Sequence, residues 1–496
     1  MTADGFVALS PLLVAIAAAL AAPLLISARR RHGLAAGTAV IGLLAGTAVI
    51  PFAATVVPIQ VTPLLIIDGF ALFVFGLVFL ASALVALLMH GYLARRELAR
   101  KEEAYILLLL AAIGAAVLAA SSHFASFFLG LETLSVSLYA LVAYTRSRPV
   151  SIEAGIKYLI LAAATSAVLL LGMAYVYAEL GVMGFAELGA ALDQGAGGPL
   201  ALVGFVLMLV AVGFKLALVP FHMWVADVYQ GAPAPVAGFL ATVSKGGVVA
   251  VTLRLLVEQE TYRATAFVTG LATMALLSIV VGNLLALLQP NLKRMLAFSS
   301  VAHMGYLLVA LLASGPSAAE AVSFYLVAYS VTTLGAFGVI GSLVREGGEE
   351  SESIEQLRGL FWRRPALAAV MTACLASLAG IPLTVGFIGK FAVLSAGVDA
   401  SHWLLVGTMI VGSVVGIVYY LRVVAVMLRE PSDAPASGDV SAGATSGAKA
   451  GANTLGSSVP ASSGVGLALL AALLLVLGVF PTPVQEWIAT AVGSLF

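Results

Sequence analysis

The segment AVGFKLALVPFHMWVADVYQGAPAPVAGFLATVSKG, residues 211–246, decides the fold. It is apolar over most of its length, yet it contains Lys215 and Lys245. A charge at the centre of a lipid bilayer costs between about 2.5 and 17 kcal/mol, depending on how the cost is measured. Lysines in such positions need partners or water, and by default they mark a functional site.

Pro220 lies a little more than one helical turn after Lys215. Proline removes a backbone hydrogen-bond donor and breaks or kinks a helix. A broken helix at membrane depth is tolerated where it is buried in protein or lines a wet cavity. Lys215, Pro220 and Lys245 together therefore indicate a hydrophilic path inside a membrane domain.

The composition places the chain in the membrane class. Of its 496 residues, 61% are hydrophobic and 10% are charged, whereas soluble proteins are about 25% charged. The net charge is zero, which gives no electrostatic reason to expect nucleic acid as a partner. The sequence thus predicts a polytopic, all-α membrane protein.

Several kinds of cofactor site are not predicted for this chain. Its single cysteine, Cys374, excludes an internal disulfide and an iron–sulfur cluster held by cysteines of this chain alone. No His, Cys or carboxylate cluster has metal-ligand spacing, and no glycine-rich phosphate loop stands between a strand and a helix. The N-terminus lacks a basic stretch before its apolar run, so we interpret it as a first membrane helix.

A helix that spans the bilayer needs about 20 mostly apolar residues. This template predicts fourteen segments, of which 199–230 and 366–398 are broken by proline. The predicted segments are 6–27, 34–57, 69–93, 104–121, 123–144, 154–179, 199–230, 235–256, 264–288, 295–314, 319–344, 366–398, 403–428 and 463–481.

Basic residues gather in the loops that follow the odd-numbered segments. By the positive-inside rule these loops are cytoplasmic, so both termini are predicted to face outside. Opposite loops hold only Arg263, with Arg254 at a helix end. The residues on the cytoplasmic side are Arg29, Arg30, Arg31, Arg95, Arg96, Arg100, Lys101, Arg146, Arg148, Lys293, Arg294, Arg345, Arg358, Arg363, Arg364, Arg422, Arg429 and Lys449.

Two polar loops stand out against the apolar background. Residues 431–462 are rich in Gly, Ala and Ser, which predicts a flexible linker on the cytoplasmic side. Residues 346–358, EGGEESESIEQLR, form an acidic loop that we interpret as a solvated connector.

The two predicted breaks echo one another. Pro220 follows Lys215, and Pro382 precedes Lys390 inside a second apolar stretch. Paired interrupted helices in two halves of a chain are typical of transporter repeats, with the site at the repeat interface.

Lys215, Lys245 and Lys390 are flanked by apolar residues, so we predict that they act in proton transfer. Lys157, near a segment start, is equally well explained as a side chain that reaches the interface. Glu132, in the middle of 123–144, needs a partner when buried, and an intramembrane lysine would serve. Glu153 is four residues before Lys157 and on the same helix face, a pair that can be structural only.

Two histidines are further candidates. His303 lies within the segment 295–314, and histidine has an ordinary pKa near neutrality, which suits a proton relay. A single histidine in a helix can equally be no more than hydrogen-bonded. His222, beside the break at Pro220, has the same two interpretations.

Five stretches resemble the antiporter-like membrane subunits of the proton-pumping NADH:quinone oxidoreductase, respiratory complex I. The resemblance runs along nearly the whole chain, and the block at 151–181 favours the subunit N branch. Related subunits and multi-subunit cation/proton antiporters share single motifs. The stretches are GLETLSVSLYALVAY (130–144), SIEAGIKYLILAAATSAVLLLGMAYVYAELG (151–181), FKLALVPFHMWVADVYQGAPAPVAGFLATVSK (214–245), KRMLAFSSVAHMGY (293–306) and AGIPLTVGFIGKF (379–391).

The resemblance implies two inverted five-helix repeats, each with a broken helix. It implies three N-terminal helices in 1–103, repeats in 104–260 and 261–430, the linker 431–462, and a last helix in 463–496. It also implies a proton relay in which Glu132 and Lys215 form a modulating pair, Lys245 is central and Lys390 faces the exit. His303 joins this relay.

The resemblance also implies partners and cofactors. NADH, FMN, iron–sulfur clusters and quinone would belong to or bind partner subunits, with no cofactor or metal in this chain. The partners would be antiporter-like and small helical membrane subunits, the peripheral redox arm reached through them, and the bilayer of a bacterial inner membrane. One alternative is a subunit of a sodium/proton antiporter without redox partners. A second is a scaffold whose charges only pair structurally.

Overall fold

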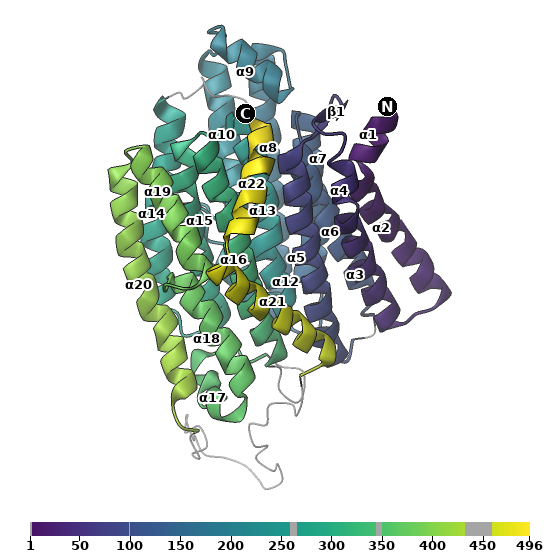
Figure 1. The fold of residues 1–496 in the computed structure, drawn as a ribbon, viewed down its shortest axis with the longest axis vertical. Coiled ribbons are helices and arrows are strands. Elements are labelled where there is room, and N and C mark those ends of the chain that lie inside the picture. Colours follow the sequence, from purple (N-terminus) through teal and green to yellow (C-terminus); the bar gives the residue numbers. More distant parts are fainter. Residues whose placement is uncertain (1, 99, 258–264, 344–349, 432–458) are drawn as a thin grey trace.

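The computed structural model describes residues 2–98, 100–257, 265–343, 350–431 and 459–496. Within these ranges the chain is an elongated helical bundle with one small β hairpin (Figure 1). Thirteen of the described helices are long and apolar enough to cross a membrane. The prediction of an all-helical membrane fold is therefore confirmed.

The N-terminal part lies at one side of the bundle (Figure 1). In its central helix, α5, the carboxylate of Asp68 caps the N-terminus by accepting a 2.8 Å hydrogen bond from the Ala71 amide. Its elements are α1 (Ala3–Ala8), α2 (Ser10–Ala28), α3 (His32–Ala48), α4 (Ile50–Ala53), β1 (Ile59–Thr62), β2 (Leu65–Ile67) and α5 (Gly69–Ala94).

The middle of the chain forms the next group of helices. Helix α6 packs on α7, and α8 packs on α10. The group consists of α6 (Glu103–Ala120), α7 (Phe124–Val142), α8 (Pro149–Leu180), α9 (Phe185–Asp193), α10 (Pro199–Leu216), α11 (Val225–Gly231), α12 (Ala234–Phe239), the π-helix η1 (Leu240–Ser244) and α13 (Lys245–Val257).

A further group follows, in which α14 packs on α15 and α16 packs on both α18 and α19. The group consists of α14 (Thr265–Leu287), α15 (Leu292–Ala313), α16 (Pro316–Ser342), the 3₁₀ helix η2 (Ile354–Leu357), α17 (Leu360–Arg363), α18 (Pro365–Ala379), α19 (Val385–Asp399) and α20 (Trp403–Leu428).

The last part crosses the bundle in two pieces. Helix α21 (Ala461–Val479) packs on α5 and α16, and α22 (Thr482–Val492) continues against the same two helices up to the 3₁₀ turn η3 (Gly493–Leu495). Pro481 lies between α21 and α22. The sequence predicted one helix over 463–481 and missed α22, because proline residues follow each other closely there and end the apolar run.

The core is centred on three helical segments, two of which carry the candidates Lys245 and His303. In Ala234–Val257 and in Pro316–Ser342, every residue of the most apolar stretch is buried, and in Leu292–Ala313 the buried share of that stretch is 94%. In α8, by contrast, only 33% of the most apolar stretch is buried. The polar residues of the central helices are thus shielded from lipid by the rest of the bundle.

The described residues of each of the fourteen predicted segments are largely helical, and segment 199–230 is interrupted at 217–224, between α10 and α11. The short separation at 121–123 is confirmed, because α6 ends at Ala120 and α7 begins at Phe124. Segment 366–398 is divided into α18 and α19.

Both chain ends lie at the same end of the bundle as α9, and α17 lies at the opposite end (Figure 1). Most of the predicted linker 431–462 falls outside the described residues.

Candidate functional site

Lys215 lies in the last turn of α10, directly before the chain leaves helical geometry at Ala217. Its side chain is buried, and its Nζ donates a 2.6 Å hydrogen bond to Oγ of Ser135 on α7. Nζ is also 5.9 Å from the centre of the Tyr158 ring, within the range of a cation–π contact. Unpaired carbonyl groups give a helix C-terminus partial negative charge, so the break at Pro220 favours a cation at this position.

Glu132 lies one turn before Ser135 on α7 and is only partly buried. Its carboxylate accepts a hydrogen bond from the Ser166 hydroxyl on α8. Among the described residues, no hydrogen bond or ion pair joins Glu132 directly to Lys215. Because Lys215 contacts Ser135, one turn after Glu132 on the same helix, the structure brings the pair into one neighbourhood without direct contact.

Lys245 follows the π-helix η1 and is almost fully buried. π-helical turns are rare and are often found at functional sites. The Lys245 Nζ donates a hydrogen bond to Oγ of Ser300 on α15. The same serine oxygen is 3.4 Å from the Tyr229 hydroxyl.

His303 lies one turn after Ser300 on α15 and is buried. Its Nδ1 is 2.7 Å from the Tyr325 hydroxyl, and its Nε2 is 3.1 Å from the Tyr420 hydroxyl. The Tyr420 hydroxyl in turn hydrogen-bonds to Ser299. The imidazole ring is therefore held from both sides.

Lys390 on α19 reaches across the second break. Its Nζ donates a 3.1 Å hydrogen bond to the carbonyl oxygen of Ala379, the last residue of α18. Pro382 lies between the two helices. Nζ is also 5.2 Å from the centre of the Tyr306 ring. Lys215 and Lys390 thus share one arrangement: the ammonium group lies at the C-terminal end of a helix beside a proline-containing break. For Lys390 that helix is α18.

The secondary candidates lie apart from these three lysines. Lys157 is half-exposed and forms ion pairs with Glu153 at 2.7 Å and with Asp227 at 2.8 Å. Asp227 also pairs with Arg294 at 2.7 Å. His222 is buried, its Nδ1 has no partner among the described residues, and its ring packs on Phe298. No described hydrogen bond connects His222 to the buried lysines.

The interpretation of 346–358 as a solvated connector is wrong for Glu350. Its side chain is fully buried and pairs with Lys293 at 2.7 Å and with Arg96 at 3.4 Å. Tyr92 donates a further hydrogen bond to it. Burial alone would raise the pKa of Glu350, but Lys293, Tyr92 and Arg96 together hold it below its ordinary value. Charge complementarity across the bundle, which composition does not reveal, explains this burial.

A second buried ion pair also escaped sequence reasoning. Arg254 of α13 binds both carboxylate oxygens of Asp68, at 2.7 and 2.9 Å, and donates to the Ala119 carbonyl oxygen at 3.1 Å.

The sequence analysis also missed Ser135 and Ser300, the hydroxyl partners of Lys215 and Lys245. Each lies three residues from a predicted site residue, so helical spacing offered a signal for both.

Comparisons with known proteins agree with this architecture. The family model described as NADH:quinone oxidoreductase/Mrp antiporter, TM, matches residues 121–416. The chain is 47% identical to NADH-quinone oxidoreductase subunit N of Ectopseudomonas mendocina, over 99% of this chain and 97% of that protein. It belongs to the subunit N family of NADH-quinone oxidoreductase. The resemblance inferred from the motifs is thereby confirmed.

Further relatives support the assignment to subunit N. The chain is 47% identical to NADH-quinone oxidoreductase subunit N of Methylococcus capsulatus, over 98% of this chain and 95% of that protein. A chain in the structure of respiratory complex I from Thermus thermophilus is 30% identical, with a TM-score of 0.79 over 97% of this chain and 99% of that one. The sequence of this chain is thus that of a subunit N, and its fold is that of a membrane chain of respiratory complex I.

Proposed function

We propose that this chain translocates protons as a membrane subunit of an NADH:quinone oxidoreductase and that it holds no redox centre itself. NADH oxidation through FMN and iron–sulfur clusters, and quinone reduction, belong to partner subunits. The single observation that carries the proposal is the partners of the three buried lysines. Among the described residues, Lys215, Lys245 and Lys390 each donate to a hydroxyl or carbonyl oxygen and have no carboxylate at salt-bridge distance.

This arrangement suits a proton relay. A lysine tightly paired with a carboxylate stays charged, whereas one held by neutral oxygen atoms can gain and lose a proton as its surroundings change. Glu132 is the group that tunes the first lysine. A redox-driven change in a neighbouring subunit alters the separation of Glu132 and Lys215, and the proton then moves to Lys245 and on to Lys390.

We also propose how the helices are arranged in repeats, how the chain is oriented in the membrane and which subunits it contacts. The two groups of helices 104–260 and 261–430 act as inverted repeats, supported by the broken helix in each. The chain lies in a bacterial inner membrane with both termini outside, supported by the basic loops and by the position of both termini at one end of the bundle (Figure 1). Other membrane subunits connect it to the peripheral redox arm.

The experiment is purification of the chain with the proteins that accompany it in mild detergent. Flavin and iron–sulfur subunits should co-purify, and the complex should oxidise NADH with a quinone. Purification with antiporter subunits only, together with sodium transport in the absence of NADH, would establish the sodium/proton antiporter instead. The family model's description includes that class, and the full-length relatives at 47% identity favour the oxidoreductase.

A further inference from the structure

Trp224 is a buried residue at the first break to which the proposed relay assigns no role. It directly precedes α11, and only 3% of its surface is exposed. A buried tryptophan N–H usually has a hydrogen-bond partner. The Trp224 Nε1 donates a 3.0 Å hydrogen bond to the carbonyl oxygen of Phe214, in the last turn of α10. The indole therefore connects the two sides of the break.

The carbonyl group that Trp224 binds belongs to the turn that carries Lys215. The Phe214 oxygen also accepts a 3.0 Å hydrogen bond from the amide of Ala217, where α10 ends. Ala217 has a φ of +59°, in the left-handed region that residues with a Cβ rarely adopt. Such a conformation persists only where the surrounding structure holds it. Trp224 contributes to this at the residue directly before Lys215.

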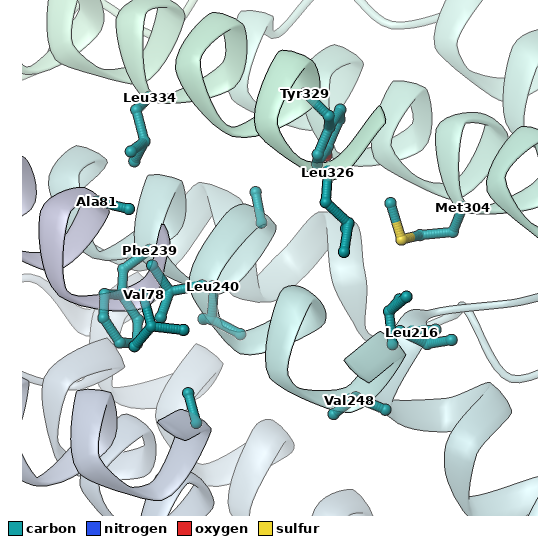
Figure 2. Close-up of a cluster of buried hydrophobic side chains, with 14 of the residues drawn as sticks. Val78, Ala81, Leu216, Phe239, Leu240, Val248, Met304, Leu326, Tyr329 and Leu334 are labelled. Carbon is teal, nitrogen blue, oxygen red and sulfur yellow. The ribbon is translucent and has the colours of Figure 1, made fainter. Parts of the chain in front are cut away.

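The residue after Lys215 is anchored by apolar packing. Leu216 is buried and belongs to the apolar cluster that also contains Val248 and Met304 (Figure 2). This packing fixes the backbone on one side of the lysine, and the Trp224 hydrogen bond fixes it on the other. The backbone of Lys215 is thus held from both sides.

The ring of Trp224 also contacts the surroundings of the lysine side chain. It stacks on the Tyr158 ring, with 4.9 Å between the ring centres and 25° between the ring planes. The Lys215 Nζ lies 5.9 Å from the centre of the same Tyr158 ring, and a cation–π contact depends on where the ring is placed. Among the described residues, no hydrogen bond or cation–π contact joins Trp224 to Lys215 directly. Its influence on the lysine therefore passes through Phe214 and Tyr158.

We propose that Trp224 is a positioning residue for Lys215, an inference that rests on the proposed function. The indole N–H holds the turn that carries the lysine, and the indole ring holds the Tyr158 ring beside the ammonium group. Together they keep the Lys215 Nζ at 2.6 Å from Oγ of Ser135. Proton transfer requires partners within hydrogen-bond reach, about 2.6–3.2 Å. A small displacement of Lys215 therefore slows the step in which it gains or loses its proton.

The test uses the assembled complex in sealed membrane vesicles. NADH-driven proton uptake is measured over a series of pH values, together with the melting temperature of each variant. Trp224→Phe keeps an aromatic ring and removes the N–H, so proton uptake should fall in part. Trp224→Leu removes the ring as well, and its proton uptake should approach that of Lys215→Ala.

The pH profile separates positioning from a purely structural role. Ser135→Ala removes the hydroxyl partner of Lys215 and should shift the pH of half-maximal proton uptake. Trp224→Phe should shift it in the same direction, because both variants take a stabilising contact away from the same ammonium group. Tyr158→Leu should reproduce this shift. If Trp224→Leu does not assemble, Trp224→Phe and Tyr158→Leu still provide the comparison.

Trp362 of α17 provides a matched control. Its Nε1 also donates to a backbone carbonyl oxygen, that of Leu428 at 3.1 Å, and no described contact joins it to a relay lysine. Trp362→Phe should leave proton uptake and its pH profile unchanged. An unchanged pH profile in Trp224→Phe, even with a lower melting temperature, would overturn the inference and leave the proposed function intact. Normal proton uptake in Lys215→Ala would overturn the proposed function itself.

Discussion

The ammonium group of Lys390 and the carbonyl oxygen of Ala379 lie 3.1 Å apart across the break between α18 and α19. Gly380, which follows Ala379, has a φ of +81°, and a Cβ at this position would lie 2.9 Å from Cδ of Lys390. The glycine thus ends one helix in a left-handed conformation and leaves room for the lysine side chain. The second break thereby positions the Lys390 side chain.

Gly380→Ala is expected to weaken proton pumping by displacing Lys390, in addition to a backbone strain of about 1–2 kcal/mol. Gly181→Ala is the matched control, since its φ is +71° and nothing lies within 4 Å of its added Cβ. Both variants should lose similar stability in a thermal melt, but only Gly380→Ala should lose pumping. Equal pumping by the two would show that the contact with Lys390 has no functional role.

Charge and shape can be separated at Glu132. Glu132→Gln keeps the shape and removes a charge one turn from Ser135, the partner of Lys215, so the proposed relay should lose its gate and pumping should fall. Glu132→Asp keeps the charge with a shorter reach and should be much milder. Native gels first establish assembly, because both variants also alter the hydrogen bond that Glu132 accepts from Ser166. Equal pumping by the Gln and Asp variants at equal assembly would exclude a gating charge.

The buried cluster around Glu350 is expected to stabilise the fold. Glu350→Ala leaves Lys293 and Arg96 without their carboxylate and should cost about 3–5 kcal/mol. Glu355→Ala removes a surface pair whose carboxylate is 59% exposed, so it should change stability by no more than about 1 kcal/mol. Thermal melts of both variants in the same detergent measure the difference, and equal melting temperatures would contradict the assignment.

The same cluster predicts a pH dependence. The folded-state pKa of Glu350 lies below its ordinary value because Lys293, Tyr92 and Arg96 outweigh the effect of burial. The carboxylate's contribution is therefore complete above about pH 4.3, the ordinary pKa of a glutamate, and is lost as the pH falls through the lower folded-state pKa. The stability gap between wild type and Glu350→Gln should close in that acidic range, and a gap that instead widens there would reverse the sign.

Membrane orientation is testable by cysteine labelling in Cys374→Ala protein. Single cysteines at Arg100 and at Ser441 in the linker should react with a membrane-impermeant reagent only from the cytoplasmic side. A cysteine at Gln194, which is exposed near α9, should react only from outside. The reverse pattern would invert the proposed topology.

Long apolar runs were sufficient to predict the spanning helices, because such a segment needs only length and hydropathy, whereas the short α22 was missed. The prolines likewise marked the two breaks. Partner choice was harder to predict, since Ser135 on α7 meets Lys215, and Ser300 on α15 meets Lys245, only after the helices pack. Glu350 belongs to a loop that was interpreted as solvated, and only packing places four cationic or phenolic groups around it: Lys293, Arg96, Arg148 and Tyr92.

The proposed proton relay depends most on Lys245, which is buried inside the bundle and donates a hydrogen bond to the Ser300 hydroxyl. The decisive measurement is NADH-driven proton uptake, together with quinone-coupled NADH oxidation, in vesicles that contain Lys245→Ala complex. Assembly is first verified on a native gel, since the variant also removes a packed side-chain stem. We predict that both activities fall together in fully assembled complex. Full coupled activity in an assembled variant would contradict the account.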